Sequence, residues 1–204
     1  MEKIISKEDL DKLKTIKGEV RGISLKRYGE YILKEKEEAG LKKVEEAMAD
    51  IGCPLKYREI KQTNFYPLWY NVLTFLAIKK LFNFDDKKFQ EMGRFCFKSP
   101  LLIKLLAKYL VSFDKAVKSV HNMWSVYFTV GRLSVTDYSQ KERYVIVSLK
   151  DYPLYPTEFP RIHCQYLTGY FPSVLQMVVG VKATGKEIKC VYRGDEDHQF
   201  LLNW

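Results

Sequence analysis

The sequence predicts an α+β fold in which an N-terminal helical bundle packs on a C-terminal antiparallel β-sheet. As far as about residue 128, apolar side chains recur at spacings of three and four, which is the period of an α-helix. Beyond that point they alternate in two neighbouring segments separated by a polar turn, which indicates a hairpin of β-strands. Helices followed by strands are typical of a domain whose helices cover one face of a sheet.

The first predicted helix covers residues 7–16, with the sequence KEDLDKLKTI. Ser6 is suited to cap its N-terminus, and Glu8 and Asp9 lie in the first turn, where the helix dipole favours acidic side chains. Gly18 ends the helix.

The rest of the front half reads as further amphipathic helices. Two are expected on either side of Gly40, and Gly52 closes the second of them. The remaining helices are expected over residues 66–82, over residues 85–97, from Ser99-Pro100 onward and from Asp114 onward. The last of these places Val120, His121, Trp124 and Phe128 on one side.

The back half reads as strands around one more helix. Residues 131–139 and 142–153 form the predicted hairpin, and a proline-rich loop leads to a helix over residues 164–180. A last pair of strands is expected over residues 187–194 and 198–204, with Gly194 at the turn.

A chain of 204 residues with 47% hydrophobic side chains can bury one full core. We expect an N-terminal helical arm over residues 1–17 and a single domain over residues 18–204.

The formal charge of +9 raises the question of a nucleic-acid partner. Its central lysines accompany the apolar residues of two predicted helices, as solvated helix faces do, so neither nucleic acid nor a membrane surface is an expected partner.

No apolar run follows a basic start, and the longest apolar stretch is cut by Lys79 and Lys80 well before the ~20 residues of a spanning helix. We therefore expect a cytoplasmic protein whose thiols stay reduced. Its cysteines are then core residues or metal ligands rather than disulfides: Cys53, Cys96, Cys164 and Cys190.

The segment EIKCVYRGDEDHQF brings together side chains that bind zinc. Glu187, Cys190 and His198 fall in one predicted hairpin, and Cys164 in the preceding helix completes the pattern Cys-x22-Glu-x2-Cys-x7-His. Residues three apart in a regular strand point to opposite faces, so Glu187 and Cys190 converge only with a bulge or turn between them. The alternative is two buried thiols with a surface carboxylate and an unrelated histidine.

The segment CQYLTGYF…GKEIKCVYRGDEDHQFLLNW resembles the C-terminal signature of the 4-vinyl reductase domain family. That signature has a cysteine before a helix with a Gly-aromatic pair, then Glu-x2-Cys, then Gly-x3-Cys-x-Phe. In members that serve as phenol-sensing input domains, these residues hold zinc beside an aromatic-ligand pocket. The resemblance implies Cys164, Glu187 and Cys190 as ligands, with His198 in place of the last cysteine. Four protein ligands leave no open position, so the expected zinc is structural.

The resemblance also implies a ligand cavity between helices and sheet. The candidate ligand-binding residues are His121, Trp124, Tyr166, Tyr170 and Phe171. A histidine beside a tryptophan can hydrogen-bond a ligand hydroxyl while rings enclose its apolar body. The alternative is ordinary core packing of the same residues.

Haem is not expected from the sequence. Related haem-based nitric-oxide sensors have a proximal histidine, for which His121 is a candidate, and a Tyr-x-Ser-x-Arg motif that grips the propionates. Here Tyr138-Ser139 continues to Arg143 with different spacing. A hydrolase built on His121 and Ser125 lacks a nucleophile elbow.

The first functional hypothesis is a non-enzymatic sensory domain that encloses an apolar or aromatic molecule, forms a homodimer and signals through a separate output protein. The alternatives are a haem-binding, tetrapyrrole-binding or tetrapyrrole-modifying protein, and a scaffold with a buried acyl chain, as in related vesicle-tethering subunits. A reductase would need a nucleotide-binding loop, and the glycine spacing predicts none.

Overall fold

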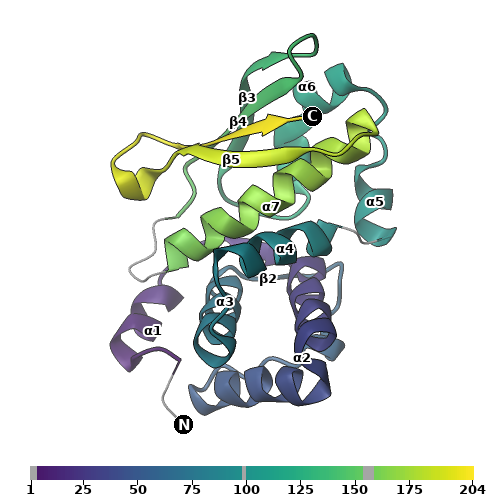
Figure 1. Ribbon diagram of the computed structural model, residues 1–204. Coiled ribbons are helices and arrows are strands. Elements are labelled where there is room, and N and C mark those ends of the chain that lie inside the picture. The colour runs from purple at the N-terminus through teal and green to yellow at the C-terminus, as the bar shows by residue number, and fades with distance from the viewer. Residues whose placement is uncertain (1–3, 98–99, 154–158) are drawn as a thin grey trace.

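The computed structural model describes residues 4–97, 100–153 and 159–204 (Figure 1). Helices pack against an antiparallel four-stranded sheet, so the predicted α+β class is confirmed. In the front half the elements are α1 (Lys7–Lys14), β1 (Glu19–Arg21), α2 (Gly22–Asp50), β2 (Phe65–Pro67), α3 (Trp69–Phe82) and α4 (Asp86–Phe97). In the back half they are α5 (Pro100–Leu106), α6 (Phe113–Ser125), β3 (Arg132–Ser139), β4 (Tyr144–Lys150), α7 (Phe159–Val179), β5 (Thr184–Lys189) and β6 (His198–Asn203).

The helical half follows the predicted pattern with local differences. Ser6 caps α1 by accepting a 3.0 Å hydrogen bond from the backbone N–H of Asp9. The break predicted at Gly40 lies at Glu37, whose φ of 56° interrupts α2. The β1–β2 pair was not predicted, because strands of three residues are too short to show an alternating pattern. A search of the described helices found none whose length and hydropathy would let it cross a bilayer.

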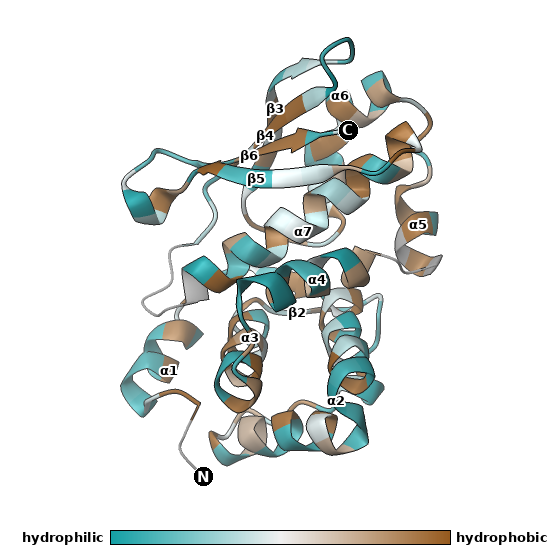
Figure 2. Cartoon of the chain, in the orientation of Figure 1, coloured by the Kyte–Doolittle hydropathy of each residue, from teal (hydrophilic) through white to brown (hydrophobic). Residues whose placement is uncertain are grey.

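The sheet has the strand order β3-β4-β6-β5. The predicted hairpin is present, with Arg132 opposite Lys150 and Ser139 opposite Tyr144. The inward-facing side chains alternate along the central strands, as they must when one face is buried: Val145, Val147 and Leu149 on β4, and Phe200 and Leu202 on β6. The central strands are therefore largely hydrophobic, whereas the edge strand β5 is mostly hydrophilic (Figure 2).

Helix α7 lies between the sheet and the helical half, with α4 beneath it (Figure 1). It begins at Phe159, five residues before the predicted start, so Cys164 lies within the helix. Two glycines let α7 and α4 approach backbone to backbone. A Cβ on Gly169 would overlap the carbonyl oxygen of Gln90, and one on Gly93 would overlap that of Tyr166. Glycine is required at this crossing because there is no room for a side chain.

The predicted proline-rich loop falls mainly on residues 154–158, and Ser99 precedes α5; both lie outside the described residues. The expected fifth helix is shorter than its apolar pattern suggested, since α5 ends at Leu106.

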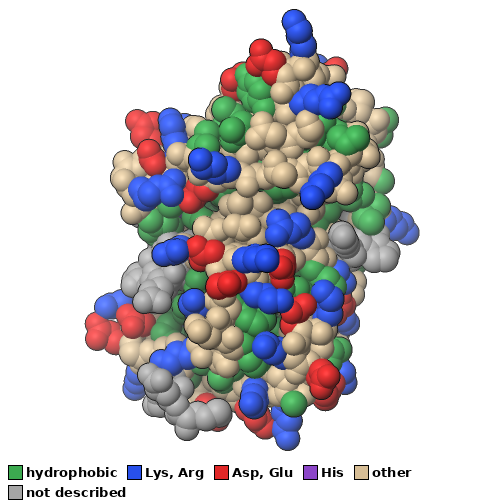
Figure 3. Space-filling model, in the orientation of Figure 1, with side chains coloured by type: hydrophobic (Ala, Val, Ile, Leu, Met, Phe, Trp, Pro, Cys, Tyr) green, Lys and Arg blue, Asp and Glu red, His purple; other side chains and the backbone are tan. Residues whose placement is uncertain are grey.

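On the face shown in Figure 3, basic and acidic side chains alternate over the helical half without forming a patch of one sign. This mixture is what a solvated protein surface shows.

Candidate functional site

Four side chains of types that can bind a metal converge where α7 meets the β5–β6 turn. Cys164 comes from α7, Glu187 from β5, Cys190 from the end of that strand, and His198 from the first position of β6. One ligand atom from each lies within 4.8 Å of the other three. The Cys164 and Cys190 Sγ atoms are 3.9 Å apart, and Cys164 Sγ is 3.5 Å from His198 Nδ1. Glu187 Oε1 is 3.6 Å from the same Nδ1.

Three of these separations are close to the edges of one coordination tetrahedron, although the four ligand atoms together span up to 4.8 Å. Zinc bonds of ~2.3 Å to sulfur and ~2.0 Å to nitrogen or oxygen give edges of about 3.8 Å between two sulfurs and about 3.5 Å from sulfur to nitrogen. The nitrogen-to-oxygen edge of such a site is about 3.3 Å. The atoms are therefore arranged so that a single cation can reach all four with small adjustments.

A β-bulge resolves the difficulty raised by the spacing of Glu187 and Cys190. The pairing of β5 with β6 shifts between Glu187 and Lys189, so Ile188 is an extra residue without a partner of its own. This shift reverses the alternation and lets Glu187 and Cys190 face the same point. Gly194, with a φ of 93°, then turns the chain towards β6.

Neighbouring groups orient the cluster. The backbone N–H of Cys190 donates a 2.7 Å hydrogen bond to Asp195 Oδ2, which holds the turn closed. Arg193 Nη1 donates a 3.3 Å hydrogen bond to Glu187 Oε2, which leaves Oε1 to face the cluster. Such outer contacts are the kind that hold ligands in place around a metal.

The electrostatics of the cluster favour a cation. Burial raises the pKa of Cys164, and the Glu187 carboxylate raises it further. Burial also raises the pKa of Cys190. For Glu187 burial acts to raise the pKa, but hydrogen bonds from His198, Cys164 and Cys190 outweigh it, and the net shift is downward. Glu187 Oε1 is buried without a hydrogen-bond partner of normal geometry, which is costly for a carboxylate unless a cation faces it.

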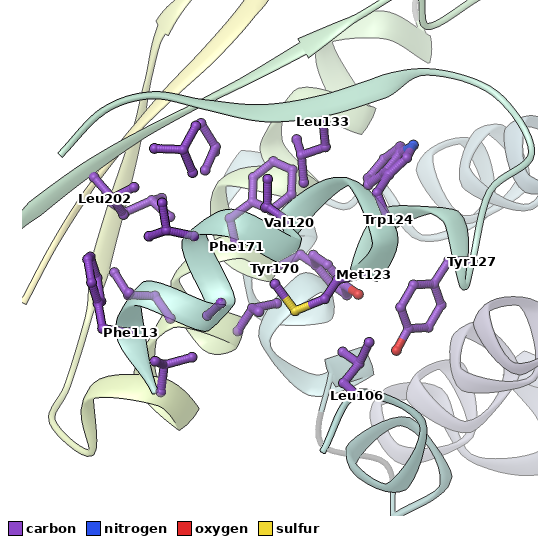
Figure 4. Close-up of a pocket in the computed structure, with 18 residues that line it drawn as sticks. Leu106, Phe113, Val120, Met123, Trp124, Tyr127, Leu133, Tyr170, Phe171 and Leu202 are labelled. Carbon is purple, nitrogen blue, oxygen red and sulfur yellow. The ribbon is translucent and has the colours of Figure 1, made fainter. Parts of the chain in front are cut away.

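A second feature is an apolar cavity of about 70 Å³ between α6, α7 and the sheet. Figure 4 shows the side chains that converge on it from these elements and from α5. Of the predicted ligand-binding residues, Trp124, Tyr170 and Phe171 line this cavity. Tyr166 instead packs in the core, with its ring 5.1 Å from that of Phe75.

His121 does not lie where we expected it. It is exposed on the outer face of α6, since it follows Val120, which lines the cavity, and each residue turns a helix by about 100°. The prediction also missed Met123 and Tyr127, which face the cavity. Their spacing of three and seven from Val120 was a usable signal. Trp124 is held in place because Nε1 donates a 2.8 Å hydrogen bond to the Val130 carbonyl.

No family model and no curated protein matches the chain. Among solved structures, an H-NOX protein from S. oneidensis in the Fe(II)NO ligation state has a TM-score of 0.64 and 11% identity, covering 90% of this chain and 98% of its own. A protein studied for modulation of haem redox potential through porphyrin distortion has a TM-score of 0.58 and 8% identity, covering 90% and 99%. At such identities the likeness shows a shared fold.

A subunit 3 of the trafficking protein particle complex from Naegleria fowleri, covalently bound to palmitic acid, is also similar. Its TM-score is 0.45 at 14% identity, covering 66% of this chain and 92% of its own.

The expectation against haem is wrong. It rested on one missing motif, whereas the fold is shared with H-NOX proteins that carry Fe(II). In the described conformation, however, the cavity residues do not fit a porphyrin. The volume of the cavity, about 70 Å³, is small for such a group. The described side chains that line the cavity include no histidine or cysteine. Because an apolar cavity that takes up benzene measures ~150 Å³, even a single ring requires this cavity to widen, and a porphyrin requires far more.

Proposed function

We propose that the chain is a sensory or regulatory domain that encloses a small apolar or aromatic molecule, with a structural zinc ion beside the cavity. The observation that supports this most directly is the position of α7. It carries Cys164 towards the cluster and, two turns later, Tyr170 and Phe171 towards the cavity. One helix therefore links the two candidate sites.

In this proposal Cys164, Glu187, Cys190 and His198 hold the ion. Two thiolates, an imidazole and a carboxylate are ligands that zinc accepts, and four of them leave no position for a substrate. When bound, the ion would supply positive charge that keeps the thiolates ionised and joins α7 to the β5–β6 turn. The arrangement supports a structural role rather than catalysis.

The wider assignment is also a proposal. We infer kinship with the 4-vinyl reductase domain family from the pattern in residues 164–198. We treat residues 1–17 as an arm and residues 18–204 as one domain, which acts as a homodimer on a separate output protein. Leu10 and Leu13 of α1 are buried, so the arm rests on the domain.

Native mass spectrometry of the untagged chain tests the main proposal. We expect one zinc ion per chain and a small-molecule mass that is lost on denaturation. Metal analysis of Cys164→Ser and Cys190→Ser should show loss of the ion, whereas Cys53→Ser, which changes a buried cysteine far along the chain, should keep it. Retention of the metal by all three variants would contradict the assignment.

Haem binding is the second candidate, favoured by the shared fold with H-NOX proteins. It predicts a Soret absorption band in the protein as purified, or after addition of haem. Saturable binding of one haem per chain would establish it, and that result would require the cavity to open well beyond its present 70 Å³.

A further inference from the structure

The cavity has one polar end in an otherwise apolar lining. Figure 4 shows the hydroxyl oxygens of Tyr127 and Tyr170 at the same end, beside Met123 and Leu106 and away from Phe113. Tyr127 comes from the turn that follows α6, and Tyr170 from α7. Their ring centroids are 6.4 Å apart and the rings are nearly perpendicular.

The hydroxyl of Tyr127 makes no hydrogen bond of normal geometry among the described residues, although the hydroxyl of Tyr170 is close enough to act on its pKa. The side chain is only 3% exposed, and its Oη atom is buried. Burial raises the pKa of Tyr127, against smaller lowering effects of Tyr170 and Arg21, so the group stays a neutral hydroxyl at physiological pH. A buried hydroxyl without a partner is unfavourable, and a ligand atom that hydrogen-bonds to it removes that penalty.

Other polar groups near the cavity do not compete for this role. Trp124 Nε1 is already bonded to the carbonyl oxygen of Val130 at 2.8 Å. The sulfur of Met123 is a weak acceptor. None of the described lining side chains carries a charge. An ionised ligand group would therefore be buried without a counter-charge in the lining, at a large free-energy cost, since Arg21, whose charge acts on Tyr127, does not line the cavity.

From these contacts we infer that the ligand is a small uncharged molecule with an apolar body and one hydroxyl or carbonyl oxygen, which binds the hydroxyls of Tyr127 and Tyr170. This inference rests on the proposed function, because it concerns the same cavity. The apolar body lies towards Phe113 and Leu202, at the opposite end (Figure 4). Met123 is the side chain best suited to yield to it, since methionine is unbranched and adaptable.

Three one-ring probes that differ in one substituent test the inference: toluene, benzaldehyde and benzoate. Their affinities are measured by titration calorimetry or NMR on the full chain. We expect benzaldehyde to bind about fivefold to tenfold more tightly than toluene, because it gains a hydrogen bond. Benzoate should bind at least tenfold more weakly than benzaldehyde, because its charge is buried.

Tyr127→Phe should remove the preference for benzaldehyde while leaving the affinity for toluene within about twofold. Tyr170→Phe should reduce it in the same direction. Tyr28→Phe is the matched control, because Tyr28 is also a fully buried tyrosine whose Oη makes no hydrogen bond of normal geometry, but it does not line the cavity. That variant should keep the preference. Thermal melts confirm that each variant is folded.

The outcomes separate this inference from the proposed function. If toluene binds and the benzaldehyde preference is absent, or survives both Tyr127→Phe and Tyr170→Phe, the polar end is not a recognition element and the inference is overturned. Met123→Ala provides a wider cavity in case the native one is too narrow for a ring. If no probe binds either this variant or the native chain, the cavity is not a ligand site and both proposals fall.

Discussion

Removal of the metal should lower the thermal stability of the native chain by about 10 °C. A site occupied at a free metal concentration ~1,000 times its dissociation constant adds about 4.1 kcal/mol to the free energy of unfolding. For a chain of 204 residues the entropy of unfolding is about 0.43 kcal/mol/K near the midpoint. The quotient of the two gives the expected shift in Tm.

The geometry explains why stability and metal content should be linked. Without the ion both thiols return to the protonated form, since their pKa values are raised, and Glu187 Oε1 stays buried without a hydrogen bond of normal geometry. The contacts that join α7 to the β5–β6 turn are then weak hydrogen bonds involving sulfur, such as the 3.9 Å approach of Cys164 to Cys190.

The assay is differential scanning calorimetry with and without a chelator, on the native chain and two variants. We expect the shift of about 10 °C in the native chain and in Cys53→Ser, whose buried thiol contacts the carbonyl of Ile51. Cys190→Ser should show a shift below about 2 °C, because one ligand is lost. A chelator shift equal in Cys190→Ser and the native chain, or absent from the native chain, would refute the reasoning.

Three further predictions follow from other parts of the fold. Gly169→Ala should lower the free energy of unfolding by about 1–3 kcal/mol, because its Cβ would overlap the Gln90 carbonyl; urea denaturation checks this, with Met177→Ala, an exposed position two turns further along α7, as control. Burial raises the pKa of Cys96 to about 12, so the folded state keeps a proton that the unfolded chain loses above about pH 9. Stability should therefore fall between pH 9 and 12, by about 1.4 kcal/mol per pH unit from this group, and Cys96→Val should reduce that slope in urea melts. His121→Ala should change the free energy of unfolding by no more than about 0.5 kcal/mol, because the side chain is exposed. It should also leave the affinity for the probes unchanged, and a marked loss of toluene binding would show that His121 reaches the cavity.

Sequence periodicity predicted the types of the longer elements, but neither the short β1–β2 pair nor the tertiary contacts. The hairpin of β3 and β4 alternates along part of its length, up to the register shift between Val135 and Asp137, and this was enough to recognise its strands from one segment. The crossing of α4 and α7 could not be recognised in this way, because it depends on Gly93 and Gly169, which are far apart in the chain and approach only in the folded state. A glycine within a helical pattern indicates reduced helix propensity, and does not reveal which backbone it meets.

The two candidate sites differ in how much the sequence could reveal. The residues of the cluster could be grouped from the sequence because all of them have side chains that can bind a metal ion: Cys164, Glu187, Cys190 and His198. Their role as metal ligands stays a prediction. The bulge at Ile188 could not be seen in advance, since one unpaired residue leaves no mark in a short strand. The cavity was harder still: an amphipathic helix shows where its apolar stripe lies, but a one-residue difference in phase decided that Met123 and not His121 faces inward.

The position of α7 also indicates which wall of the cavity moves when a ligand enters. Its backbone is held against α4 at Gly169, so a shift of α7 would require the helical half to move with it. Helix α6 faces the cavity through side chains such as Val120 and Met123. We therefore expect binding of toluene to change hydrogen exchange of the α6 amides by at least about fivefold, with α7 near Gly169 little affected. Equal changes in the two helices would mean that the glycine crossing does not fix α7, and a change confined to α7 would reverse the assignment of the moving wall.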